Sequence, residues 1–237
     1  MGFASKALPL GAAAAFLAGC GYAPSSTVDF SDNGVLMPSA RLAFAVGRPG
    51  PEAPSHPQDG HAVEITVTAA SGHGAQSLGA GDPILLGSQT FNPPVQMSYD
   101  FDYSFVHVAY RFRWLPGQAR RFGVEGLIGP AFADMNLVAR GGGLRATEDV
   151  SSAGLGLGGG VFYRLLPGSS LHARVTHFAG LDASADRIEL FAAQALGRNV
   201  AVRAGWSQWT YDAERESNRS GIRIRFSGPM AGLDVMF

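Results

Sequence analysis

The sequence lacks several features that mark common classes of protein. It has a single cysteine, Cys20, so no disulfide can form within the chain. Charged residues make up only 16% of the chain, and the net charge of −1 lacks the basic excess of a nucleic-acid binder. Beyond the N-terminus no apolar run approaches the roughly 18 residues that a transmembrane helix needs. These absences argue against a disulfide scaffold, a nucleic-acid partner and a helical membrane protein.

Glycine is abundant, with 32 residues, and apolar and polar side chains alternate from His61 onward. A period of two predicts β-strands. The alternating stretches are 61–69, 98–114, 122–137, 153–164, 171–176, 187–192, 200–207 and 220–237. We therefore predict an all-β fold, an eight-stranded antiparallel up-and-down transmembrane β-barrel over residues 61–237. Ten strands are the alternative, if residues 41–47 and a hairpin within 71–97 both join.

The apolar side chains change phase within three of these stretches. The changes follow Phe105, the pair Gly129-Pro130 and the pair Gly228-Pro229. A β-bulge inserts one residue and turns the following side chains to the other face. We therefore expect bulges at these points, which would keep the apolar side chains on one face of each strand.

The N-terminus has the composition of a signal peptide, with Lys6 followed by a mostly apolar stretch, Ala7–Ala18. Leu17-Ala18-Gly19-Cys20 resembles the lipobox of bacterial lipoproteins. The resemblance implies that residues 1–19 are removed and that Cys20 is lipidated. The alternative is an ordinary secretory signal with an incidental cysteine. Residues 20–60, rich in Pro, Gly and Ser, are expected to form a periplasmic tether. The apolar run 41–47 within it is open to three interpretations, an isolated strand, a plug or an extra barrel strand.

The C-terminal residues Gly232, Val235 and Phe237 match a second signal. Their spacing resembles the insertion signal of bacterial outer-membrane β-barrels, and the whole pattern is similar to the OmpA transmembrane domain and the opacity-type surface proteins. The resemblance implies a Gram-negative outer membrane, with membrane lipid and the barrel-insertion machinery as partners. Short and longer connections alternate along the chain, as in such barrels. The longer ones, 71–97, 140–149 and 212–219, would then face an unknown extracellular partner.

Alternation also predicts which charged side chains face the lumen. An eight-stranded barrel is just wide enough to be filled by side chains, and buried charges are costly unless they pair. We expect a paired network that plugs the interior, with a narrow anion-preferring channel as the minor alternative. The predicted inward residues are Glu64, His107, Arg111, Arg113, Glu125, Arg164, His172, Arg174, Arg187, Glu189, Arg203, Arg223, Arg225 and Asp234.

A group of aromatic residues falls near the short connections. Aromatic rings prefer the headgroup level of a membrane, so we expect one aromatic girdle there. Its members are Phe112, Trp114, Phe122, Tyr163 and Phe237.

The sequence offers little support for an enzyme. His177 with Glu189 loosely resembles the arrangement in barrel lipid A deacylases, but the position of their serine is Ala179 here. Ser184 and Ser207 are loose substitutes for this serine, without a motif around them. A serine hydrolase without its nucleophile cannot form an acyl intermediate.

The six histidines have no metal-ligand spacing. We therefore expect no metal, no cofactor and no catalysis, and a structural or adhesive role at the cell surface. A soluble periplasmic lipoprotein, whose β-barrel binds a small apolar ligand, is the alternative from another class.

Overall fold

The computed structural model describes residues 26–29, 35–46, 60–79, 83–116, 121–213 and 222–237, and all regular structure in them is β-strand. The prediction of an all-β fold is therefore confirmed. None of these residues belongs to a helix long and apolar enough to cross a membrane. The strands are β1 (Ser26–Asp29), β2 (Met37–Val46), β3 (Gly60–Leu78), β4 (Ile84–Leu86), β5 (Gln89–Phe91), β6 (Val95–Trp114), β7 (Phe122–Gly141), β8 (Leu144–Leu166), β9 (Ser169–Gly180), β10 (Ala183–Ala195), β11 (Val200–Ala213) and β12 (Ile222–Met236).

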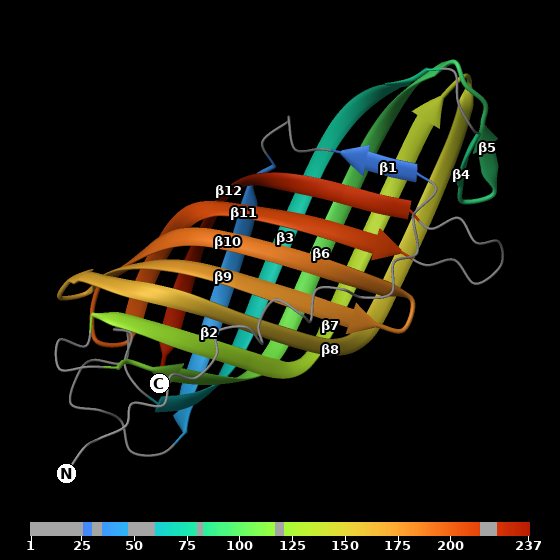
Figure 1. Ribbon diagram of the computed structural model, residues 1–237. Helices are drawn as coiled ribbons and strands as arrows, with labels where there is room; N and C mark the ends of the chain where they lie inside the picture. Colours follow the sequence, from blue (N-terminus) through green and yellow to red (C-terminus); the bar gives the residue numbers. More distant parts are fainter. Residues whose placement is uncertain (1–25, 30–34, 47–59, 80–82, 117–120, 214–221) are drawn as a thin grey trace, which may run out of the picture.

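Nine strands form one large antiparallel sheet, in the order β2-β3-β6-β7-β8-β9-β10-β11-β12. The sheet closes on itself because β12 also pairs with β2, in parallel, from Met230 opposite Met37 to Met236 opposite Ala43 (Figure 1). β1 pairs in parallel with the first residues of β12. We call the end of the sheet where β12 finishes the C-terminal end.

The closed sheet has one strand more than the eight predicted. The extra strand, β2, contains most of the run 41–47 within the predicted tether. Of the three interpretations of this run, the structure shows an additional strand of the large sheet. Arg41 and Ala43 are buried while Leu42 and Phe44 are exposed, so β2 has the alternation that both neighbouring strands require. The alternative with ten strands is wrong in its second part, because the hairpin within 71–97, β4 and β5, pairs with itself outside the large sheet.

Four strands, β3, β6, β7 and β8, project far beyond their neighbours opposite the C-terminal end (Figure 1). β2 pairs with β3 no further than Thr68, and β9 pairs with β8 only from Gly154 onward. We call the projecting part the extension, with edges at residues 69–78 and 144–153. Much of 71–97 and nearly all of 140–149, both predicted as loops, belong to these strands. Glycine and serine suggested loops there, but each strand has a full-length partner to pair with.

The side chains keep their phase through each long strand, except at the end of β8, where the register with β9 shifts between Arg164 and Leu166. Phe105 and His107 are both buried, while Ser104 is exposed and Val106 lies on the same outer face. The register of β11 with β12 likewise runs unbroken from Val200 opposite Val235 to Ala213 opposite Ile222. The three predicted bulges are therefore wrong.

What changes along each strand is the chemistry of its two faces. Toward the extended end, the inside is aromatic and aliphatic and the outside is polar. Toward the C-terminal end, the inside is charged and the outside is apolar. On β6 the switch lies between Ser104 and Val106, and on β7 between Asp134 and Phe132, which are the residues paired with them. Apolar side chains fill the extended half and ion pairs fill the other.

Candidate functional site

Ten charged side chains meet inside the closed sheet near its C-terminal end, and none is more than 7% exposed. We call this cluster the charged core. It holds six arginines and four carboxylates, contributed by every sheet strand except β8. Its members are Arg41, Glu64, Arg111, Arg113, Glu125, Arg174, Arg187, Glu189, Arg203 and Asp234.

Glu64 on β3 joins three different strands. Its carboxylate lies 3.0 Å from Nε of Arg41, 2.5 Å from Nη1 of Arg111 and 2.9 Å from Nη1 of Arg174. Thr66 donates a further hydrogen bond of 3.2 Å. A carboxylate shared in this way ties β2, β6 and β9 together across the interior.

Glu125 on β7 completes the same side of the cluster. Nε of Arg113 lies 2.8 Å from its carboxylate, and Nε and Nη2 of Arg174 both lie 2.9 Å from it. Arg174 therefore bridges Glu125 and Glu64. Each buried charge has a partner of opposite sign, which offsets much of the cost of removing it from water.

The other side of the cluster surrounds Arg203 on β11. Its Nε lies 2.8 Å from Asp234 and its Nη2 donates to Ser39 at 2.7 Å. Nη2 of Arg187 lies 2.6 Å from Glu189. Asp234 also faces Arg41 at 3.5 Å, so ion pairs cross the junction between β2 and β12.

Aromatic rings pack against these ions. The guanidinium groups of Arg41 and Arg203 lie 5.5 and 5.8 Å from the ring centre of Phe191, and that of Arg187 lies 4.8 Å from Trp209. Such cation–π contacts stabilise arginine where water is excluded. Trp209 therefore covers the cluster on its extended side, and Phe191 packs within it between the levels of Glu189 and Arg203.

Glycines on β8 explain why this strand contributes no charge. The inward positions Gly156, Gly158 and Gly160 carry no side chain, and a Cβ at Gly156 would lie 2.5 Å from the ring of His107. A Cβ at Gly160 would lie 3.3 Å from Glu125. The glycine row leaves room for the long side chains of neighbouring strands.

Nine of the fourteen predicted lumen residues belong to the charged core, and five do not. His107 and His172 are buried on the inner face without being part of this cluster. Arg223 and Arg225 lie on the outer face of β12, where the predicted bulge is absent, and Arg164 lies half-buried near the end of β8. Arg223 pairs with Asp212 at 2.6 Å, and this hydrogen bond raises the pKa of Arg223. The prediction missed Arg41, although its alternation with Leu42 was visible in the sequence.

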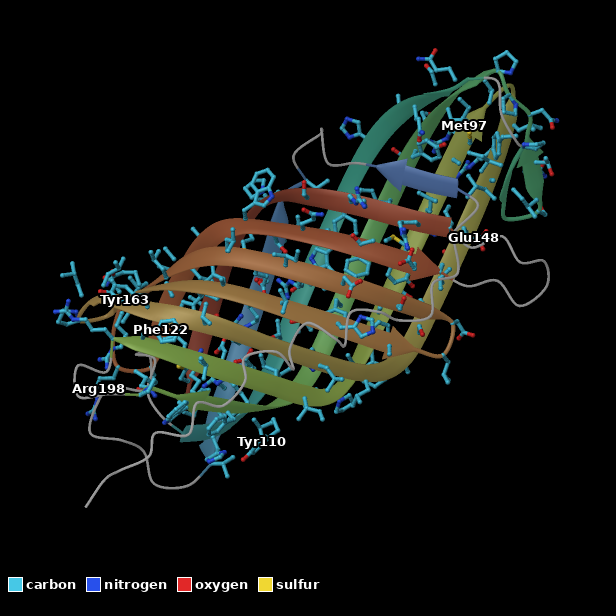
Figure 2. All side chains as sticks on the ribbon, viewed as in Figure 1. Met97, Tyr110, Phe122, Glu148, Tyr163 and Arg198 are labelled. Atoms are coloured by element: carbon cyan, nitrogen blue, oxygen red, sulfur yellow. The ribbon has the colours of Figure 1, made fainter. Side chains whose placement is uncertain are left out.

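The five predicted girdle residues all lie outside, at the C-terminal end, with exposed fractions between 42% and 60%. Figure 2 shows Phe122, Tyr163 and Tyr110 toward this end, and Met97 and Glu148 in the extension. Phe237 stacks on Phe44 of β2 at a centroid distance of 5.3 Å.

The other two residues of the predicted insertion signal lie on opposite faces of β12. Val235 lies on the outer face, and Gly232 leaves space for Arg203, since a Cβ would lie 2.8 Å from its Nε. Cys20 and the predicted signal peptide lie outside the described residues.

The loosely matched catalytic residues do not come together. Glu189 is buried in the charged core, whereas His177 lies on the outer face and pairs with Asp186 at 2.8 Å. Ser207 is buried and accepts a hydrogen bond of 3.5 Å from Arg187. In the described part of the chain no three His, Cys, Asp or Glu side chains form a group that could hold a metal ion.

No protein-family model, curated protein or solved structure matches this chain. Its function has to be inferred from its own geometry. The features available are the charged core, the apolar outer band around it and the polar extension.

Proposed function

We propose that this chain is a nine-stranded transmembrane β-barrel of the Gram-negative outer membrane, with a structural or surface-interaction role. One observation carries the proposal, the inversion of inside and outside chemistry along the strands. The charged core lies at the level of the apolar outer band, as in a barrel that crosses lipid. The aromatic interior lies at the level of the polar outer face, as in a protein domain in water.

The dimensions of the apolar band suit a membrane. On β6 it runs from Val106 to Trp114, and roughly 9–11 tilted residues cross a bilayer as a β-strand. Exposed apolar residues from the other strands complete it, among them Leu42, Ile128, Leu157 and Ile188. The extension then lies in water outside the cell, and the charged core closes the lumen to ions.

A soluble periplasmic lipoprotein that binds a small apolar ligand remains the second candidate. Its support is the apolar interior of the extended half, around Phe101, Tyr103 and Trp209. Against it, Trp114, Phe132 and other large apolar side chains would be about half exposed to water along the whole band.

Gel mobility of the detergent-extracted outer-membrane fraction, with and without boiling, tests the choice. A band that shifts on heating supports the barrel. The soluble lipoprotein is supported if the band does not shift on heating and the protein leaves the membrane once its lipid anchor is removed. Mass spectrometry of the N-terminal peptide tests lipidation of Cys20, and planar-bilayer recordings should detect no steady conductance.

A further inference from the structure

The extension has two edges, and they differ in how they are protected. The β8 edge, residues 144–153, carries Arg145, Glu148 and Asp149, and the β4–β5 hairpin packs against it. The backbone N–H of Gly87, at the hairpin turn, donates a hydrogen bond of 2.5 Å to Glu148. Charged side chains and a covering hairpin are common ways of preventing a sheet edge from pairing with another chain.

The β3 edge has neither form of protection. Residues 69–78 read A-A-S-G-H-G-A-Q-S-L, without Lys, Arg, Asp, Glu or Pro. They pair with β6 on one side. On the other side no described strand pairs with them, because the pairing of β2 with β3 ends at Thr68. A long edge of small residues can accept a further extended strand through backbone hydrogen bonds.

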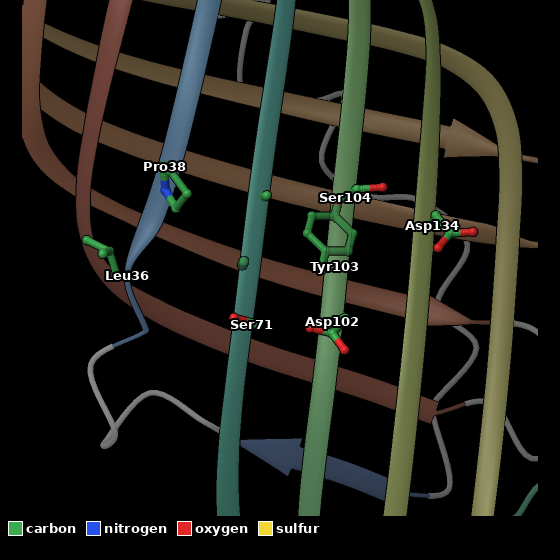
Figure 3. Close-up of a pocket in the computed structure, with 9 residues that line it drawn as sticks. Leu36, Pro38, Ser71, Asp102, Tyr103, Ser104 and Asp134 are labelled. Atoms are coloured by element: carbon green, nitrogen blue, oxygen red, sulfur yellow. The ribbon is translucent and has the colours of Figure 1, made fainter.

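A cavity of about 310 Å³ lies where β2 and β3 separate (Figure 3). Leu36 and Pro38 line one side of it, and Ser71, Asp102 and Asp134 lie on the strands beyond. The carboxylate of Asp102 is exposed and has no partner among the described residues. Its chemistry therefore favours a basic side chain above an apolar rim.

We infer that the β3 edge binds an extended segment of a partner protein, which adds a strand beside residues 69–78 and directs a lysine or arginine across Ser71 toward Asp102. The inference deepens the proposed surface-interaction role and rests on it. A second copy of this chain fits less well, because its own residues 69–78 contain no lysine or arginine to place beside Asp102.

The probe is a fluorescent ten-residue peptide that alternates threonine and lysine, with a threonine–glutamate peptide as its match. Protein folded in uncharged detergent should bind the lysine peptide about threefold to fivefold more tightly, as expected for one exposed ion pair with Asp102. Asp102→Asn with Asp134→Asn should reduce this preference to below about twofold. The matched control, Asp182→Asn with Asp186→Asn, removes the same charge from exposed positions on the β9–β10 side and should leave it unchanged.

Two further measurements test the backbone pairing. Two versions of the lysine peptide, methylated at the odd or at the even backbone nitrogens, test the hydrogen bonds, and at least one of them should not bind. Binding of the unmethylated peptide should slow hydrogen exchange of the backbone amides within residues 69–78. Equal binding of the lysine and glutamate peptides, or protection elsewhere, overturns the inference. So does slowed exchange at 69–78 in a peptide-free dimer. Gel mobility of the same sample, with and without boiling, separates the two possible failures. A band that still shifts on heating means that only the inference about the β3 edge fails, and not the proposed barrel.

Discussion

Glu64 is the best position at which to test whether the charged core holds the strands together. Three arginine side chains lie within 3.0 Å of its carboxylate, and the residue is fully buried. Glu64→Gln keeps the shape but removes the charge, so the excess of arginine over carboxylate in the cluster rises. Removing one partner of a buried ion pair costs about 3–5 kcal/mol. Because glutamine can still accept a hydrogen bond, we expect about 3 kcal/mol.

The assay is equilibrium unfolding by urea in lipid vesicles, followed by tryptophan fluorescence. Asp100→Asn is the matched control, because it removes a carboxylate from an ion pair with Arg140 whose side chains are about half exposed. Such pairs contribute about 0–1 kcal/mol. Adding Arg111→Met to the Glu64→Gln variant should recover part of the lost stability, since it removes a charge left without its partner. Equal small losses from Glu64→Gln and Asp100→Asn would refute the reasoning.

Three further outcomes are expected. Val108→Arg, within the apolar band, should reduce the free energy of unfolding in vesicles by about 2–4 kcal/mol. Ser104→Arg, on the same outer face of β6 but in its polar part, should change this free energy little. Equal effects of the two variants would contradict the proposal that the apolar band lies in lipid. Gly129→Ala should destabilise the protein by at least about 1–3 kcal/mol, because the added Cβ would collide with the backbone of β6. Gly126→Ala on the same strand is the control, because a Cβ there meets nothing within 4 Å. Urea unfolding compares the stability of the two variants. Burial raises the pKa of Tyr99 to about 12 from about 10, so the stabilisation from its neutral form should be complete below pH 10 and be lost as the pH rises through 12. Absorbance titration of the phenolate, compared with a Tyr99→Phe variant, measures the pKa of Tyr99. A titration midpoint near 10 would contradict this prediction.

The sequence predicted the strands and the membership of the charged core well, because strict alternation alone assigns the inner face. Glu64, Arg111 and Arg174 fall on that face in any register that keeps the period of two. Arg41 was missed because its strand lies among Pro- and Gly-rich residues, and nothing local indicates that β2 is paired on both sides. Its pairing with Asp234 depends on residues 193 positions apart.

The predicted bulges failed for a different reason. We assumed that apolar side chains stay on one face, so Tyr103 and Phe105 seemed to require a change of phase before Val106. That assumption holds for a strand in one environment. Along these strands the apolar face changes from the inside to the outside, and this reversal looks like a bulge in the sequence. Arg223 and Arg225, which lie on the outer face, were assigned to the lumen by the same error.

The parallel junction of β2 with β12 has a consequence for the order in which the molecule is assembled. The other eight pairings of the closed sheet join strands that follow one another in the chain, apart from the short hairpin within the β3–β6 connection. The junction instead joins residues 37–43 to 230–236. Contacts between distant residues form slowly, because a long loop must close before they are gained. The cylinder should therefore close last, and the contact between Arg41 and Asp234 would mark the final step of folding.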